Sequence, residues 1–285
     1  MIKKVTITLL LLLLVLLSTS ERLDLNSSEQ LDTALTRSLS TFAVARGLNG
    51  LVSMVQGTEI NISPVGLGAT FTPGQLLDPV NDMVERFSWV MLMSSVSIGV
   101  QEAMLHLGKT TLFKLLFALV ALLLLAQLWF KGLHLPWSLE KSLKVMLLLA
   151  LLRFSVPLLV WLNEMVYEAV LEQEYTHAYA EVVMTSSEVN TMVTELQMKK
   201  ATLEEERSFM DRFNVSQQYD DFKRELKASV DAFIIAFNEA MESMIRLITV
   251  FVLNAIIIPL LALWLFIYGT GYLMRQDLST WIETK

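Results

Sequence analysis

Histidines and carboxylates at helical spacing are the first residues in this chain whose types suggest chemistry. Glu174 and His177 stand at i and i+3, as in di-iron helix bundles, and Glu102 and His106 stand at i and i+4. A di-iron site needs two Glu-x-x-His pairs and two further glutamates on facing helices, whereas this chain has 3 histidines in all. We interpret both pairs as solvated helix faces. The sequence also has no GxSxG, GxGxxG or GxxxxGK[S/T] motif, so we predict no enzyme, no metal site and no cofactor.

Arg153 is the most unusual residue, because it is a charge inside an apolar segment. It falls near the middle of a predicted transmembrane span, residues 145–162, where a charged side chain costs at least about 2.5–3.5 kcal/mol. Pro157 follows one turn later and frees a backbone carbonyl, and Asn254 lies at a similar predicted depth in the last span. Three interpretations stay open. These intramembrane polar residues hold helices together, line a path for an ion or solute, or meet an acidic residue of another subunit.

The composition narrows the class of protein. Of the 285 residues, 54% are hydrophobic, and they concentrate in a few long runs, as in transmembrane helices. The net charge of −7 argues against nucleic acid as a partner, because phosphate binding requires clustered Lys and Arg. The chain has no cysteine, which excludes disulfides, Cys-ligated metals and a cysteine nucleophile.

The apolar runs predict an all-α membrane protein with about four transmembrane helices. Lys3 and Lys4 precede a short apolar run, the pattern of either a signal peptide or an uncleaved signal anchor, and place the amino terminus in the cytoplasm. We predict a multi-pass protein of the plasma (inner) membrane with both termini cytoplasmic. The predicted segments are a signal anchor or signal peptide (1–20), an extracytoplasmic helix/β-hairpin/helix (21–109), a span (110–130), a cytoplasmic loop (131–144), a span (145–162), an extracytoplasmic helical hairpin (163–245), a span (246–273) and a cytoplasmic tail (274–285).

Two stretches of the first extracytoplasmic segment are less regular. Residues 58–74 alternate apolar and polar side chains around Pro64 and end in Pro73-Gly74, which predicts a small β-hairpin. Residues 79–107 predict a helix, but the apolar part, 87–100, is shorter than the roughly 20 residues of a span. We expect a buried or surface helix there, with a membrane crossing as the alternative.

The segment 163–245 carries apolar residues at heptad-like spacing. This pattern predicts coiled-coil-like helices, folded as an antiparallel hairpin of roughly 186–212 against 216–245 with a capping box at 185–188. We predict that the stripe forms an interaction surface, and that some of the 15 methionines make it adaptable. Its residues are Val182, Val189, Leu196, Leu203, Met210, Phe222, Leu226, Phe233 and Phe237.

These patterns predict a non-enzymatic membrane scaffold or adaptor. Its extracytoplasmic helical module would dock or assemble with another membrane or envelope protein, or with itself. The alternative is a subunit of a channel or transporter with a polar path near Arg153 and Asn254. The small number of polar residues in the other spans argues against that alternative. The partner, the oligomeric state and any transported solute stay open.

Overall fold

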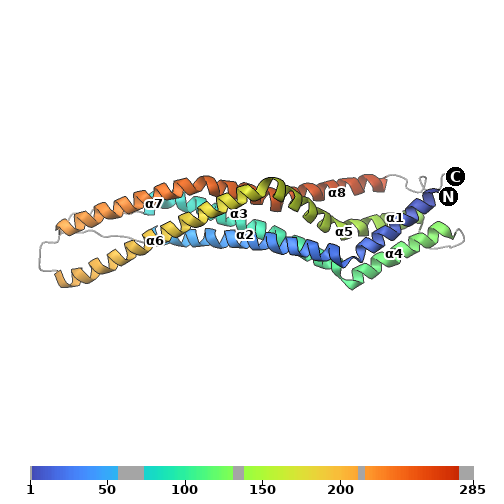
Figure 1. The fold of residues 1–285 in the computed structure, drawn as a ribbon, viewed down its shortest axis with the longest axis horizontal. Coiled ribbons are helices and arrows are strands. Elements are labelled where there is room, and N and C mark those ends of the chain that lie inside the picture. The colour runs from blue at the N-terminus through green and yellow to red at the C-terminus, as the bar shows by residue number, and fades with distance from the viewer. Residues whose placement is uncertain (1, 57–73, 131–137, 211–215, 276–285) are drawn as a thin grey trace. The chain divides into compact units, whose positions relative to one another are not determined.

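The computed structural model describes residues 2–56, 74–130, 138–210 and 216–275, and these ranges are almost entirely helical (Figure 1). No strand occurs within them. The predicted β-hairpin of residues 58–74 lies outside the described residues apart from Gly74, which begins a helix. The helices are α1 (Ile2–Ser18), α2 (Glu21–Gln56), α3 (Gly74–Lys109), α4 (Thr111–Trp129), α5 (Leu139–Val166), α6 (Glu172–Met210), α7 (Ser216–Phe251) and α8 (Ile258–Arg275).

Four helical stretches are long and apolar enough to cross a membrane. They are Leu77–Lys109, Thr111–Trp129, Leu139–Lys199 and Lys227–Tyr272. A fifth candidate is the pair formed by α1 and α2, which meet at a bend of 52°. The chain is therefore a multi-pass helical membrane protein by the length and composition of its helices. The first stretch contains residues 87–100, so a membrane crossing there, the alternative to a buried or surface helix, is compatible with its length and composition.

Two π-helical turns join the last two predicted spans to the helices of the predicted hairpin. The turn η1 (Tyr167–Leu171) connects α5 to α6, and η2 (Val252–Ile257) connects α7 to α8. A π turn interrupts the regular ladder without ending the helix, so no loop separates the apolar segments from the polar ones. The predicted break at the capping box 185–188 is absent, because α6 is continuous there. A serine carbonyl in that stretch, Ser187 O, accepts from Thr191 Oγ1 at 3.1 Å within the helix.

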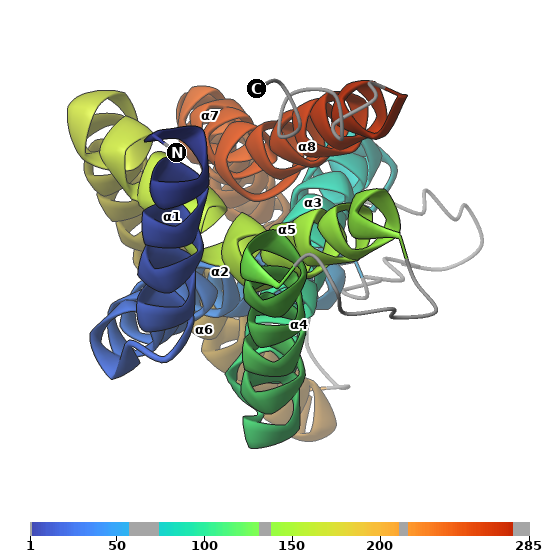
Figure 2. The same cartoon turned by 90° about the vertical axis from the view of Figure 1, so that its right-hand side faces the viewer.

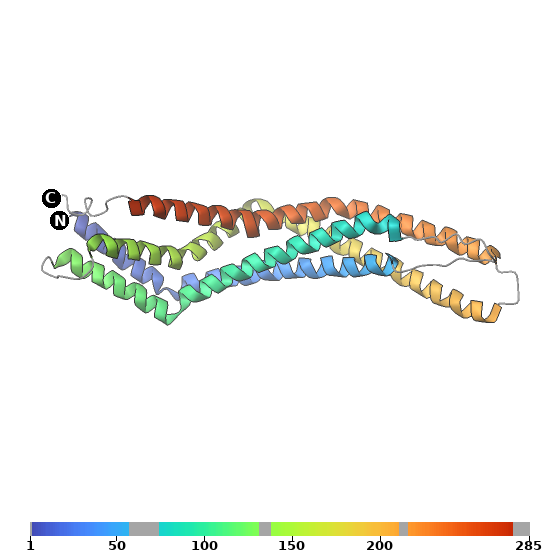
Figure 3. The same ribbon diagram turned by 180° about the vertical axis from the view of Figure 1, so that it is seen from behind.

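The chain divides into two compact units. Unit 1 contains Met1–Thr36, Ser94–Ala169 and Leu253–Lys285, and unit 2 contains Arg37–Met93 and Val170–Val252. Within unit 2, α2 and α3 lie side by side (Figures 1 and 3), and Ser38 Oγ donates a hydrogen bond to Met91 O at 3.2 Å.

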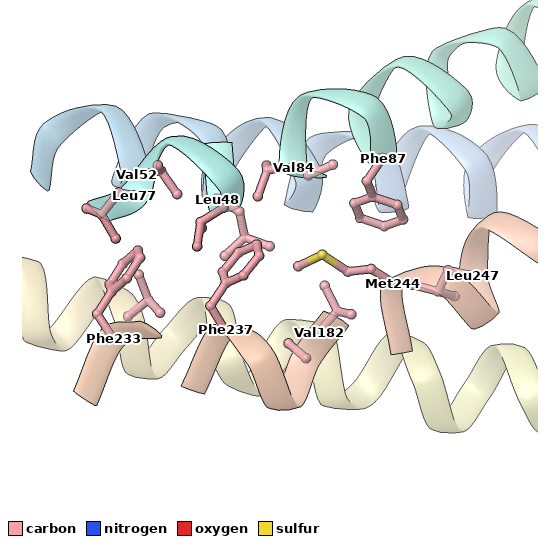
Figure 4. Close-up of a cluster of buried hydrophobic side chains, with 14 of the residues drawn as sticks. Leu48, Val52, Leu77, Val84, Phe87, Val182, Phe233, Phe237, Met244 and Leu247 are labelled. Atoms are coloured by element: carbon pink, nitrogen blue, oxygen red, sulfur yellow. The ribbon is translucent and has the colours of Figure 1, made fainter. Parts of the chain in front are cut away.

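Unit 2 packs parts of four helices around one apolar core. Figure 4 shows side chains from α2 and α3 facing side chains from α6 and α7. Burial of aromatic and aliphatic side chains of this size contributes about 1.5–3 kcal/mol each. The labelled residues are all buried, and they are Leu48, Val52, Leu77, Val84, Phe87, Val182, Phe233, Phe237, Met244 and Leu247.

The helices α6 and α7 pack antiparallel, as the sequence predicted for this segment. Glu181 accepts a hydrogen bond from Ser243, and Glu174 pairs with Arg246 at 3.4 Å. Glu174 precedes Glu181 on α6, whereas its partner Arg246 follows Ser243 on α7. The two helices therefore run antiparallel. The predicted turn between the helices, at 211–215, lies outside the described residues.

Unit 1 contains two apolar clusters. The first surrounds Phe117 of α4 and includes Leu11 of α1 and Met146 of α5; Figure 2 shows these three helices close together. Near the start of α1, Lys4 Nζ donates to Leu128 O at 2.8 Å, and Trp129 Nε1 donates to Thr8 Oγ1 at 3.0 Å. Because Leu128 and Trp129 end α4, the two helices run antiparallel. The second cluster joins α2, α3, α5 and η2 through Leu31, Ile98, Leu105, Val156, Val160 and Ala255.

Large apolar side chains also cover the outer surfaces of α1, α4 and α8. Leu9, Leu122 and Leu260 are 62%, 67% and 59% exposed, respectively. Exposed apolar surface on this scale is unfavourable in water and suits contact with lipid chains.

Candidate functional site

Arg153 of α5 is the largest fully buried side chain among the described residues, at 1% exposure. Its Nε and Nη2 donate to Ser18 O at 3.2 and 2.8 Å, and Nη2 also donates to Asp24 Oδ1 at 2.7 Å. Ser18 is the last residue of α1, and the carbonyls in the last turn of a helix lack helical partners. The guanidinium therefore caps the carboxyl end of α1, where a cation is electrostatically favoured.

Asp24 is shared between two cations. Its Oδ2 accepts from Lys114 Nζ at 2.9 Å, and the side chains of Asp24 and Lys114 are 8% and 22% exposed. Asp24 lies in the first turn of α2, where the helix dipole favours an acid. Lys114 lies near the start of α4, where the dipole disfavours a cation, and Asp24 offsets this. Two cations thus share one carboxylate, which leaves one positive charge unbalanced among Arg153, Asp24 and Lys114, hereafter the Arg153 cluster.

Arg153, which the sequence places near the middle of a predicted span, lies beside the ends of two neighbouring helices. It contacts the end of α1 directly and the start of α4 through Asp24. At 1.5 Å per residue, α1 and α4 are about 25 and 28 Å long, close to the thickness of the bilayer hydrocarbon core, about 30 Å. Helix α5 continues past Arg153 in both directions, from Leu139 to Val166, and residues 145–162 are apolar on both sides of it.

Pro157 and Gly108 shape the surroundings of Arg153. Pro157 is buried in α5 and has no N–H, so the carbonyl of Arg153, four residues earlier, loses its helical partner. A β-carbon on Gly108 of α3 would lie 3.8 Å from Arg153 Cδ and Nη1 and 3.9 Å from Arg153 O. Gly108 of α3 therefore packs close to the guanidinium and the freed carbonyl, at a distance that a β-carbon would just fill.

Arg153 pairs with Asp24 and not with Asn254, the polar residue predicted at a similar depth. The acidic partner therefore comes from the same chain rather than from another subunit. Asn254 lies in η2 beside Ala255, whose carbonyl accepts from Ser97 Oγ of α3 at 2.5 Å. Both residues are thus close to α3, but Arg153 lies beside Gly108, whereas Asn254 lies near Ser97.

One face of α3 brings small and polar residues into the interior of unit 1. Ser94, Gln101 and Gly108 recur every seven residues, and we call this face the α3 seam. Ser94 and Gln101 are 0% and 7% exposed. Ser94 Oγ, both amide atoms of Gln101 and Asn254 Oδ1 are buried without a hydrogen-bond partner among the described residues. The seam was not predicted from the sequence, although the seven-residue spacing of Ser94, Gln101 and Gly108 is visible there.

The described part of the predicted interaction stripe is mostly inside unit 2. Val182, Val189, Phe233 and Phe237 are buried in its core, and Leu196 is half-buried. These side chains hold the bundle together. The side chains of the other stripe residues, Leu203, Met210, Phe222 and Leu226, lie outside what the structure describes.

The histidine–carboxylate pairs lie on exposed helix faces. His177 Nδ1 is 3.4 Å from Glu181 Oε1, with both side chains largely exposed, and His106 Nδ1 lies 3.3 Å from Glu102 O. No group of three or more His, Asp or Glu side chains that could hold a metal occurs in the described ranges.

A relaxed phosphate-loop pattern, Ala-x-x-x-x-Gly-Lys-Thr, occurs at residues 103–110. The structure excludes a phosphate loop there, because residues 103–109 belong to α3. In the interior of a helix the backbone N–H groups are bonded to carbonyls of the preceding turn, so they are not free to surround a phosphate.

Tyr175 of α6 lies among aromatic side chains of unit 2. A side-chain hydrogen bond joins Tyr175 to Thr41 of α2. Its ring stacks on Tyr179 at 5.5 Å and meets Phe251 edge-on at 5.8 Å. Tyr175 is therefore a packing residue that joins α6 to α2 and α7.

The fold and the Arg153 cluster define a multi-pass helical membrane protein with a second, helical unit. Comparison of the chain with known protein families, curated proteins and solved structures gives no match.

Proposed function

We propose that this protein is a membrane scaffold or adaptor whose unit 2 docks another envelope protein or a second copy of the chain. The observation that carries the proposal is helix continuity. Helices α5–η1–α6 and α7–η2–α8 each contribute an apolar membrane segment and a segment of the unit 2 bundle, with no loop between them. This architecture suits a protein that presents a helical bundle from the membrane.

Exposed methionines on unit 2 supply a docking surface. Met184 and Met198 are 64% and 62% exposed and stand two heptads apart on α6, so they share one face of it. Met54 of α2 is 52% exposed and accepts from Gln197 Nε2 at 3.8 Å. We call Met54, Met184 and Met198 the methionine face. Flexible, polarizable methionines suit surfaces that adapt to a partner.

Site-specific crosslinking in membranes tests this function. The chain has no native cysteine, so Met184→Cys carries a thiol-reactive photocrosslinker at one position. Asn190→Cys, exposed on another face of α6, is the control. A second protein captured reproducibly at Met184 and not at Asn190 supports docking. Capture of this chain alone at Met184 supports self-assembly, and no capture at the methionine face argues against the scaffold function.

The second candidate function is a channel or transporter subunit. The observation that favours it is the set of buried polar atoms without partners at the α3 seam and Asn254. Such atoms cost about 1–3 kcal/mol each when left unpaired, and water or a ligand is their usual partner. Reconstitution of the purified chain in vesicles, with flux measured, tests this candidate separately from docking.

We further propose that both termini face the cytoplasm and that the membrane is the plasma (inner) membrane. The support is the distribution of Lys and Arg in the short segments, which favours the cytoplasmic side for the loop at 131–144 and for both ends of the chain.

A further inference from the structure

We propose that the α3 seam lines a water-filled passage that ends at Arg153 and takes small anions. This inference names the solute class for the second candidate function above. It does not depend on docking, and its test measures hydration and charge preference rather than flux.

The first step is the polarity of the seam. Ser94 and Gln101 point into unit 1, where their neighbours on α3, Ile98 and Leu105, belong to an apolar cluster. Gln101 offers a donor and an acceptor there, and neither has a partner among the described residues. Water satisfies both at once, and buried waters typically bind such groups with about three hydrogen bonds.

The second step is the position of η2 beside the seam. Ser97 lies between Ser94 and Gln101 on α3, and it donates to Ala255 O in η2. Asn254, the neighbour of Ala255, adds another buried acceptor without a described partner. The unpaired atoms of α3 and η2 therefore flank a single helix–helix contact. π turns occur frequently at functional sites, because the regular helical ladder is loosened there.

The third step is the charge at the end of the seam. Gly108 continues the seam two turns beyond Gln101 and faces Arg153, with Nη1 3.8 Å from the position of an added β-carbon. Arg153 Nη1 is buried without a partner among the described residues. Asp24 balances only one of the two cations in the Arg153 cluster. An anion at Nη1 neutralises the remaining charge, whereas a cation is repelled.

Cysteine reactivity tests the proposal in the full-length protein in membranes, because no native thiol interferes. Ser94→Cys, Gln101→Cys and Gly108→Cys probe the seam. Ile98→Cys and Leu105→Cys are matched controls on the same helix, since they are as deeply buried, at 4% and 1% exposure, but lie in the apolar cluster. Methanethiosulfonates react with the thiolate, which forms only where water reaches the sulfur.

The seam cysteines are expected to be modified while both controls stay unmodified. At Gly108→Cys, the anionic sulfonatoethyl reagent is expected to react at least about tenfold faster than the cationic trimethylammonium reagent, as in charged clefts that concentrate counter-ions. Each rate is first divided by that reagent's rate with a free thiol. The preference should fall in a Lys114→Gln background, which removes one positive charge.

Two results would overturn the proposal. Seam cysteines that react no faster than the controls mean that the seam is dry. Reactive seam cysteines with no charge preference at Gly108 mean that the passage does not select anions. Ser94→Cys differs from serine by one atom, so it reports on hydration even if the larger change at Gln101 impairs folding.

Discussion

Arg153 Nη2 lies 2.7 Å from Asp24 Oδ1 across 129 positions of the chain, and this contact ties α5 to the start of α2. The same guanidinium holds the end of α1 through Ser18 O. Both partners flank the 52° bend between α1 and α2. One side chain of α5 therefore fixes the geometry at which α1 turns into α2.

Replacing Asp24 with asparagine should strongly destabilise the protein. The change leaves Arg153 buried with an uncompensated charge, and breaking one partner of a buried pair costs about 3–5 kcal/mol. Thermal unfolding of the purified protein in detergent measures the loss. Asp32→Asn is the control, because Asp32 is an exposed acid on the same helix. Equal stability of the two variants would contradict a structural role for the Asp24–Arg153 pair.

Replacing all three charged residues of the Arg153 cluster should lower the stability of the protein far less than replacing Asp24 alone. Apolar residues of similar volume often replace buried ion pairs at neutral or improved stability. The triple variant Arg153→Met, Asp24→Leu, Lys114→Met is therefore expected to unfold at a temperature near that of the native chain. If it matches Asp24→Asn instead, the hydrogen bonds to Ser18 O, rather than charge balance, dominate the site.

Side-chain size at Gly108 should decide whether α3 can pack on Arg153. Gly108→Ala is expected to be tolerated, because its β-carbon meets Arg153 at 3.8 Å, an ordinary contact distance. Gly108→Leu has no such space and should lower the unfolding temperature by displacing the guanidinium. Gly99→Leu is the matched control on α3, since a β-carbon there has no neighbour within 4 Å.

The sequence predicted the helices better than it predicted which faces they bury. Long apolar runs and helical periodicity are local signals, so the apolar helices at 110–130 and 145–162 and the pairing of α6 with α7 could be predicted from the sequence. The partner of Arg153 could not be predicted in this way, because only the bend between α1 and α2 brings Asp24 close to Arg153. Phe233 and Phe237 belong to the predicted interaction stripe but are buried in the core of unit 2, because a periodic stripe does not reveal whether other helices of the same chain cover it.

The core of unit 2 provides a clear contrast between buried and exposed stripe positions. Phe237 is 0% exposed in the core, whereas Ile235, two residues earlier on α7, is 59% exposed. Phe237→Ala should cost about 3–5 kcal/mol, because it removes a large side chain and leaves a cavity. Ile235→Ala should change the free energy of unfolding little. Chemical denaturation of the full chain measures both, and similar losses would mean that α7 packs with a different face inward.

The proposed orientation predicts which thiols an impermeant reagent can reach. Gln217→Cys, in α7, should be labelled in intact cells, and His134→Cys, between α4 and α5 in the sequence, only after lysis. This follows if α1, α4, α5 and α8 cross the membrane and α3 does not. The stretch Leu77–Lys109 is itself long and apolar enough to cross, and a crossing there would invert every later segment. Labelling of His134→Cys in intact cells, with Gln217→Cys protected, would therefore identify α3 as a fifth span; its core residues Phe87 and Met91, both 0% exposed, would then lie at membrane depth.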